Sequence, residues 1–231
     1  MGRATALRLA GGGAHPVASD LDPDAAGCTA ELVERAGGTA TPIGLDVTDS
    51  AAVAAAMRSV ADQYGDRFDG LVNNAGTDRG AGITEITDEH WQSVIAVNQS
   101  APLYTAREFV RLMSDRATDD SQPADIVNVI SISAITVGTE AAAYNSSKAA
   151  LAMLTRIMQR EAHEYCWPVR VHGLMPSAMN TPMMEQWQLS DEVMMDPDTV
   201  ASAIEFMLCL PADSFIQNLV VNSRREPGWP R

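Results

Sequence analysis

Positive charge is scarce in this 231-residue sequence. Only 16 lysine and arginine residues stand against 30 aspartate and glutamate residues, which gives a formal net charge of −14. Proteins that bind nucleic acids need a basic footprint to displace counterions from phosphate, whereas the arginines here are scattered along the chain. The composition therefore argues against a nucleic-acid partner.

Long apolar runs and cysteines are also scarce. No run approaches the roughly 18 apolar residues that cross a bilayer, and the first 20 residues lack the pattern of a secretory signal, so we expect a cytoplasmic protein without membrane contact. Cys28, Cys166 and Cys209 are too few and too far apart for a disulfide framework, and we expect buried free thiols. The four histidines show no ligand spacing, so no metal site is expected.

Apolar residues are abundant enough to form a core, since 46% of the chain is hydrophobic and 20% is charged. The length predicts a single domain over residues 1–231. Short apolar runs alternate with longer amphipathic stretches. The predicted strands are His15–Asp20, Ala40–Asp46, Gly70–Asn74, Asp125–Ser131, Val169–Met175 and Phe215–Val221, and the predicted helices are Ala4–Ala10, Pro23–Ala36, Ser50–Tyr64, Asp88–Met113, Ala141–Tyr165 and Pro197–Leu210. The alternation predicts an α/β fold with a doubly wound parallel sheet.

The only lysine of the chain, Lys148, stands four residues after Tyr144. This spacing places both side chains on one face of a helix. A neighbouring ammonium stabilises phenolate, so it can lower the pKa of a phenol from its usual value near 10. The pair predicts a tyrosine that acts as a general acid or base on an alcohol or carbonyl oxygen. A coincidental pair on a solvated helix is the alternative.

Polar residues close two of the predicted strands, at the edge where doubly wound sheets bind ligands. Ser131 and Ser133 follow an apolar strand, and a hydroxyl there can hold a substrate oxygen beside the phenol. Strand alternation does not separate these two serines. The run Asn73-Asn74-Ala75-Gly76 ends another strand, where small residues let a ligand approach the backbone. An ordinary strand-end turn is the alternative in each case.

Together these motifs resemble the classical short-chain dehydrogenase/reductase family from about residue 2 to about residue 222. The matching motifs are Asn73-Asn74-Ala75-Gly76, Val97-Asn98, Ser131 with Tyr144 and Lys148, and Pro176 followed by Thr181. The resemblance selects Ser131, because the family's catalytic hydroxyl lies thirteen residues before its tyrosine. It implies a Rossmann-like fold and an oxidoreductase that acts on alcohols and ketones with a nicotinamide cofactor.

The resemblance also implies a role for each site residue. Tyr144 would exchange a proton with the substrate oxygen, and Lys148 would lower the phenol's pKa and bond the nicotinamide ribose. Ser131 would orient the carbonyl, and Asn98 would hold a water in the proton relay. The other expected cofactor contacts are Gly2, Asp20, Asp46, Val47, Asn73, Ala75, Gly76, Pro176 and Thr181. The nicotinamide is expected to supply the hydride, since no side chain can.

The expected cofactor is NAD rather than NADP. Asp20 closes the second strand of the family fold, where a carboxylate accepts hydrogen bonds from a ribose 2′-hydroxyl and repels a 2′-phosphate. No arginine directly follows Asp20 to bind that phosphate.

The start of the chain departs from the family pattern. Family members open with a strand and a Thr-Gly-x-x-x-Gly-x-Gly turn that cradles the pyrophosphate at a helix N-terminus, whereas Met1-Gly2-Arg3-Ala4 resembles only the end of that turn. We expect the first strand and most of the glycine-rich loop to be missing. We interpret this as an incomplete sequence, and a damaged relative is the alternative. Gly11-Gly12-Gly13 is expected to end the first helix rather than to replace the loop.

Six of the 12 methionines, and Trp187, fall between Met175 and Met195. By the resemblance, residues 176–196 form a mobile lid, and its adaptable apolar side chains favour a hydrophobic or 3-oxoacyl-like substrate. Packing of the lid against the domain is the alternative. The stretches Asp88–Met113 and Ala141–Tyr165 correspond to the family's subunit interface, which implies a homodimer or homotetramer.

Two functions therefore remain open. The set of Asn98, Ser131, Tyr144 and Lys148 favours an NAD(H)-dependent oxidoreductase. The missing glycine-rich turn favours a non-catalytic relative that keeps the fold for binding or regulation. Cofactor binding by the protein would distinguish the two.

Overall fold

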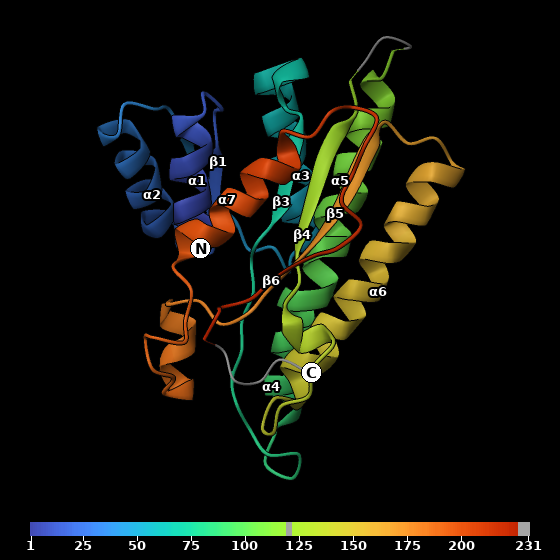
Figure 1. Cartoon of the computed structure of the whole chain (residues 1–231). Coiled ribbons are helices and arrows are strands. Elements are labelled where there is room, and N and C mark those ends of the chain that lie inside the picture. The colour runs from blue at the N-terminus through green and yellow to red at the C-terminus, as the bar shows by residue number, and fades with distance from the viewer. Residues whose placement is uncertain (119–121, 226–231) are drawn as a thin grey trace.

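The computed structural model describes residues 1–118 and 122–225 (Figure 1). Its strands are β1 (Val17–Asp20), β2 (Thr41–Gly44), β3 (Gly70–Asn73), β4 (Ala124–Val129), β5 (Val169–Pro176) and β6 (Leu219–Val221). Its α-helices are α1 (Gly2–Gly11), α2 (Pro23–Arg35), α3 (Ser50–Tyr64), α4 (Asp88–Ile95), α5 (Ala101–Arg116), α6 (Ala142–Glu164) and α7 (Pro197–Leu208). All paired strands are parallel. The predicted α/β fold with a parallel sheet is therefore confirmed.

Short polar side chains start four of the helices. Asp22, Asp49, Thr87 and Asp196 each accept a hydrogen bond from a backbone N–H in the first turn of the helix that follows. Proline stands at the first position of α2 and α7, where its missing N–H costs no hydrogen bond. Each cap contributes about 1 kcal/mol to stability, so these helix starts are encoded locally.

The stretch predicted as one helix over Asp88–Met113 is interrupted. A π-helical turn, Ala96–Ser100, separates α4 from α5. Pro102 has no N–H to donate to the carbonyl of Asn98 four residues earlier, so a regular α-helix cannot continue through this point. The interruption places Asn98, one of the predicted site residues, in the irregular turn.

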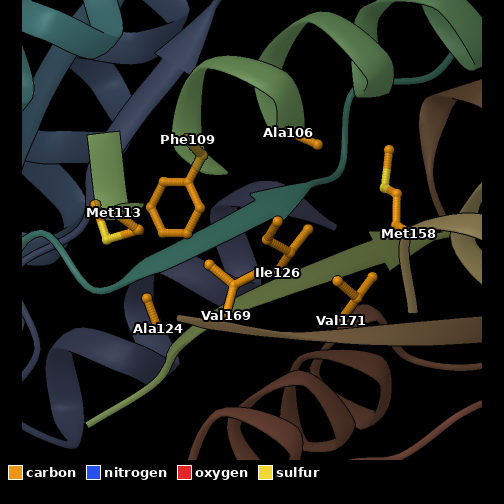
Figure 2. Packing of buried hydrophobic residues seen from close by; sticks show 8 residues of the cluster. All are labelled: Ala106, Phe109, Met113, Ala124, Ile126, Met158, Val169 and Val171. Carbon is orange, nitrogen blue, oxygen red and sulfur yellow. The ribbon is translucent and has the colours of Figure 1, made fainter. Parts of the chain in front are cut away.

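Strand β4 lies at the centre of the core and is buried on both faces. Ile126 packs with Phe109 of α5 and Met158 of α6, as Figure 2 shows. Its neighbour Val127 points to the opposite face and packs with Ile204 of α7. Because successive strand residues point to opposite faces, helices cover both faces of this sheet. This arrangement confirms the doubly wound architecture.

The strands form two separate sheets rather than one. Within residues 1–118 and 122–225, β1 pairs only with β2, and the other sheet has the order β3-β4-β5-β6. In the described residues no strand lies between β1 and β3, as the start of the sequence led us to expect. A single cavity is lined by residues of both free edges, from 16 to 20 and from 69 to 74. Helix α1 packs on α7 and so holds β1 and β2 beside the larger sheet.

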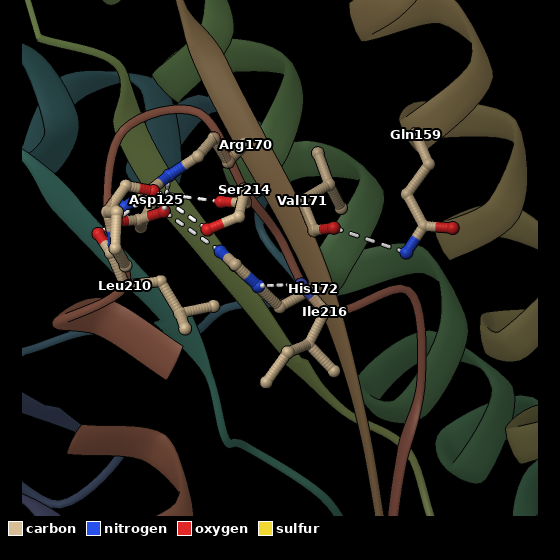
Figure 3. A network of polar contacts seen from close by, with 9 residues as sticks. Asp125, Gln159, Arg170, Val171, His172, Leu210, Ser214 and Ile216 are labelled. Carbon is tan, nitrogen blue, oxygen red and sulfur yellow. Dashed lines mark hydrogen bonds and ion pairs between the residues drawn. The ribbon is translucent and has the colours of Figure 1, made fainter. Parts of the chain in front are cut away.

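A buried ionic network holds the amino-terminal edge of the larger sheet (Figure 3). Arg170 donates to both carboxylate oxygens of Asp125 at 2.8 Å, and the Nε2 of His172 lies 2.9 Å from the same carboxylate. The Nδ1 of His172 accepts the Ile216 N–H, so Nε2 carries the proton in the neutral ring and donates it to Asp125. Arg170 also donates to three carbonyls of the segment that leads to β6, including that of Ser214. The network attaches this segment to β4 and β5.

The prediction of buried thiols was wrong, because all three cysteines are exposed. Cys28 stands two residues after the buried Ala26 of α2 and thus on the opposite side of the helix. Cys166 and Cys209 follow the ends of α6 and α7, where the chain turns at the surface. Hydrophobic character alone therefore misplaced them. No helix in the described ranges is long and apolar enough to cross a membrane.

The two free strand edges should be visible in hydrogen exchange. Backbone amides of β1 and β3 that face the gap have no strand partner in the part of the chain that the structure describes, whereas β4 is paired on both sides. We expect these β1 and β3 amides to exchange faster than those of β4, measured residue by residue by NMR on the native protein. Equal protection of the amides of β1, β3 and β4 from exchange would contradict a gap between β1 and β3.

Candidate active site

The carboxyl ends of β1, β3, β4 and β5 open into one cavity of ≈ 2340 Å³. Every predicted site residue except Asn98 lines it: Gly2, Asp20, Asp46, Val47, Asn73, Ala75, Gly76, Ser131, Tyr144, Lys148, Pro176 and Thr181. Parallel strands bring these residues together because their carboxyl ends lie on the same edge. Residues far apart in the sequence thus meet in one cleft.

Tyr144 and Lys148 lie in the first two turns of α6 and share one face, as their spacing predicts. The Nζ of Lys148 stands 5.7 Å from the centre of the Tyr144 ring. It donates a hydrogen bond of 3.1 Å to the carbonyl of Val129 at the end of β4. Lys148 is only 4% exposed, so β4 and the phenol ring fix the position of its ammonium.

The phenol of Tyr144 is less acidic than expected. Burial raises the pKa of Tyr144 to about 12, the Asp78 carboxylate acts in the same direction, and a hydrogen bond with Ser131 opposes them. Burial also lowers the pKa of Lys148 to about 8, against the attraction of Asp78. Desolvation is the largest effect on both groups in this enclosed site. Tyr144 is therefore protonated at neutral pH.

Ser131 is the serine that pairs with the phenol, in agreement with the family spacing. Its Oγ also accepts the N–H of Ser133 at 3.1 Å and so caps the short 3₁₀ helix Ile132–Ala134. This turn follows β4 directly and holds the Ser131 hydroxyl in place. Ser133 lines the same cavity.

Asn98 does not face the cleft with its side chain. Its Oδ1 accepts the Thr77 N–H, and its Nδ2 donates to the Thr77 carbonyl and to the hydroxyl of Ser147. Ser147 in turn donates to the carbonyl of Tyr144 at 2.7 Å. The amide thus connects the segment after β3 to α6. The expected role of Asn98 in holding a water stays a prediction.

The side chain of Asn73 also points away from the cleft. Its Nδ2 donates to Asn128 Oδ1 at 2.8 Å, and its Oδ1 accepts the Thr105 hydroxyl at 2.6 Å. Asn128 donates onward to Thr155 at 3.0 Å. The chain of bonds crosses from α5 through β3 and β4 to α6. Sequence reasoning missed this role, although an asparagine within the apolar run of β4 was an available signal.

The expected cofactor-binding residues at the far end of the cleft are carboxylates in ordered turns. Asp20 accepts the Asp22 N–H at 3.1 Å. Asp46 accepts both the N–H and the hydroxyl of Thr48, and these hydrogen bonds lower the pKa of Asp46. Near Lys148, a Cβ on Gly76 would stand 3.6 Å from the Nζ of Lys148, an ordinary van der Waals contact.

One acidic residue of the cleft was not anticipated. Asp78 Oδ2 accepts the indole N–H of Trp187 at 3.0 Å, and the Asp78 carbonyl accepts Gln186 Nε2 at 3.1 Å. Gly80 N–H donates to Gln186 Oε1 at 3.1 Å. The 3₁₀ helix Pro182–Trp187 of the expected lid is therefore attached to residues 78–80. No motif marks Asp78, and its position just past the Gly76 turn is the signal that could have identified it.

Lys148 should destabilise the fold at neutral pH. Its pKa is lowered from 10.5 to about 8 in the folded protein, so the folded state bears the cost of the buried charge below pH 8 and loses that cost as the pH rises to about 10.5. We expect Lys148→Met to raise the free energy of unfolding at pH 7 by about 1–3 kcal/mol.

Chemical denaturation at pH 7 and near pH 10.5 measures the effect, and the difference should shrink at the higher pH. Arg156→Met, which removes a cation from the exposed side of α6, is the matched control. A Lys148→Met variant less stable than the wild type at pH 7 would contradict the prediction.

Known proteins are similar to this chain in sequence and in fold. The family profile described as short chain dehydrogenase matches residues 1–192. The 2,3-dihydro-2,3-dihydroxybenzoate dehydrogenase of Bacillus subtilis is 33% identical over 82% of this chain and 69% of its own length. The 3-oxoacyl-acyl-carrier-protein reductase of Thermotoga maritima is 30% identical over 80% of this chain and 72% of its own length.

The crystal structure of a short chain dehydrogenase from Mycobacterium smegmatis superposes with a TM-score of 0.82 at 27% identity, covering 97% of this chain and 87% of that one. The alcohol dehydrogenase of Thermococcus sibiricus, solved with 5-hydroxy-NADP, has a TM-score of 0.85 at 24% identity, covering 99% and 93%. The latter likeness concerns the fold alone. From the profile match and these relatives, the chain belongs to the short-chain dehydrogenase family.

Proposed function

We propose that this chain transfers a hydride between NAD(H) and an alcohol or ketone with a hydrophobic body, with Tyr144 as the general acid or base. Membership of the family makes the chain an oxidoreductase and implies an NAD(P) cofactor. The observation that carries the finer proposal is the meeting of Tyr144, Ser131 and Lys148 at one end of a cleft.

The residues of the cleft fit a dinucleotide. Asp20, Asp46 and Val47 line one end and would hold the adenosine part, and Tyr144, Lys148 and Thr181 line the other and would hold the nicotinamide part. When bound, the nicotinamide supplies the hydride. The Asp20 carboxylate supports NAD over NADP, because it would accept a ribose hydroxyl and repel a phosphate.

Each catalytic side chain has a distinct task. The phenol of Tyr144 is protonated at neutral pH and so can donate its proton to a carbonyl oxygen during reduction. Ser131 would hydrogen-bond the same oxygen. In the direction of oxidation the phenol must first lose its proton, and the Lys148 ammonium over its ring favours that step.

Apolar side chains of the 176–196 segment support a hydrophobic substrate. Met179, Met183, Met184 and Leu189 line the same cavity as Tyr144. Methionine adapts to irregular apolar ligands, and a 3-oxoacyl-like chain fits such a wall. The exposed Leu103, Met153 and Ile157 on α5 and α6 support a homodimer or homotetramer.

A non-catalytic relative is the second candidate. It is favoured by the gap between β1 and β3 among the residues the structure describes. Such a protein would keep the fold while binding the dinucleotide weakly. Cofactor binding and turnover therefore decide between the two candidates.

Replacement of Tyr144 by phenylalanine tests the catalytic role. We expect kcat/KM for secondary alcohols with NAD⁺ to fall by about 10²–10⁴-fold, because the proton acceptor is lost while the ring remains. Tyr104→Phe on α5, outside the cleft, is the matched control. Turnover is followed by NADH absorbance, and an unchanged rate in Tyr144→Phe would overturn the mechanism.

Cofactor choice is tested by titrating the protein with NADH and NADPH and recording cofactor fluorescence. We expect NADH to bind more tightly, and Asp20→Ala to reduce the difference by removing the repulsive carboxylate. Asp213→Ala removes an equal charge outside the cleft and should leave the ratio unchanged. Tighter binding of NADPH by the wild type would contradict the assignment, and binding of neither cofactor would favour the non-catalytic candidate.

A further inference from the structure

The start of helix α6, which carries Tyr144, has no side-chain cap. Its N-cap residue is Ala141, whose methyl group accepts no hydrogen bond from the first turn. The backbone hydrogen bond from the Asn145 N–H to the Ala141 carbonyl, at 2.8 Å, begins the helical ladder, and Tyr144 precedes that donor by one residue. Helix ends of this kind fray unless other groups hold the first turn. The position of Tyr144 therefore depends on contacts from outside the helical ladder.

Ser147 supplies a contact that reaches the main chain of Tyr144. Its hydroxyl donates to the Tyr144 carbonyl at 2.7 Å and accepts an N–H of the Asn98 amide at 3.0 Å. A serine hydroxyl has a single hydrogen, so the amide donor and the carbonyl acceptor together fix its orientation. Ser147 and Asn98 are both 0% exposed. Bulk water therefore does not compete for either hydrogen bond.

The amide of Asn98 is fixed from the other direction. Its Oδ1 accepts the Thr77 N–H and its Nδ2 donates to the Thr77 carbonyl, both at 2.8 Å. Turning the amide over would place donor against donor and acceptor against acceptor, and would break both hydrogen bonds. Ser147 therefore links Tyr144 to a fixed attachment on the segment that follows β3.

The other two catalytic side chains are held independently of this link. Lys148 donates to the Val129 carbonyl at the end of β4, and Ser131 caps the short 3₁₀ helix that follows β4. Ser131 and the Tyr144 phenol share a hydrogen bond. A movement of the first turn of α6 would thus displace the phenol from Ser131, while the ammonium and the serine stay with β4.

We propose that Ser147 is a positioning residue: by holding the Tyr144 carbonyl, it keeps the phenol at hydrogen-bond distance from Ser131. This inference rests on the proposed function and adds to it a residue that acts through Tyr144 rather than on the reacting atoms. Without the Ser147 hydroxyl, the Tyr144 carbonyl loses its side-chain donor and one N–H of the Asn98 amide loses its acceptor. The first turn of α6 then moves, and proton transfer slows because it depends on the placement of the phenol.

Asn145 offers a competing attachment for the same turn. Its Nδ2 donates to the carbonyl of Thr136 at 2.9 Å, which ties the turn to the loop after Ser131. If Asn145 alone fixed the turn, replacing Ser147 would alter stability but not the rate of proton transfer. The two explanations therefore differ in the kinetics of a Ser147 variant.

Replacement of Ser147 by alanine tests the proposal on the whole 231-residue protein. We expect kcat for the oxidation of 1-phenylethanol with NAD⁺ to fall by about 10–100-fold. The KM values for the alcohol and for NAD⁺ should stay within about threefold, because Ser147 is not among the described residues that line the cavity. Ser146→Ala, the same change at the exposed neighbouring position of α6, is the matched control and should leave kcat unchanged.

Two further variants separate the hydrogen bonds of Ser147 from the packing of its side chain. Ser147→Cys keeps a side chain of similar size but replaces the hydroxyl by a thiol, a weak donor and acceptor, and kcat should fall in this variant as well. Ser147→Thr keeps a hydroxyl that can still bond the carbonyl of the preceding turn, and it should be more active than Ser147→Cys. This pair also gives the answer if Ser147→Ala does not fold. Wild-type kcat in Ser147→Cys, or lower activity in Ser147→Thr than in Ser147→Cys, would overturn the proposal.

The ¹³Cζ signal of the Tyr144 ring in NMR is a readout that needs no turnover, because it responds to hydrogen bonding of the phenol. Labelling with ¹³C-tyrosine gives one such signal for each of the four tyrosines, and that of Tyr144 is the signal missing in Tyr144→Phe. We expect this signal to shift in Ser147→Ala and to stay in place in Ser146→Ala. An unmoved signal in Ser147→Ala would contradict the proposal.

The positioning role and the proposed function can fail separately. A wild-type protein without turnover would refute the proposed function, while the Tyr144 signal still shows whether Ser147 holds the phenol. Normal turnover of the wild type together with an unchanged kcat in Ser147→Ala would refute the positioning role alone.

Discussion

The buried amide pair of Asn73 and Asn128 is the interaction on which the site depends. Inside a protein, each amide group must find partners, because an unpaired one costs as much as a lost hydrogen bond. Thr105 on α5 and Thr155 on α6 supply those partners at the two ends. These hydrogen bonds help to hold β3 and β4 in one register. The Gly76 turn and Ser131, which follow the carboxyl ends of the two strands, therefore both line the cavity.

Much of the fold is visible in the sequence because it is encoded locally. Alternating apolar runs predict the strands, and capping residues such as Asp49 and Asp196 predict helix starts from a single side chain. The sequence predicted one parallel sheet that lacks its first strand, whereas the structure has two separate sheets. The π-helical turn before Pro102 and the exposure of Cys28 were not predicted, since each depends on a specific backbone bond or on which helix face meets the core.

The site divides in the same way. Spacing alone places Tyr144 and Lys148 on one face of α6, and family spacing selects Ser131. Spacing says nothing about desolvation, so it predicted an acidic phenol where burial produces the opposite. The partners of Asn98 and Asp78 lie far away in sequence, at Ser147 and Trp187. Only the folded chain shows that these side chains are held by the protein.

Because Lys148 is the only lysine of the chain, its burial also limits which chemical modifications the folded protein can undergo. These 231 residues carry no other side-chain amine, and that one is enclosed. Acetylation, ubiquitin attachment and amine-directed crosslinkers therefore find no side-chain target on the outer surface of the folded chain. Any such reaction at Lys148 would record an opening of the cleft. The rate at which an amine reagent labels Lys148 therefore measures how often the cleft around this residue opens.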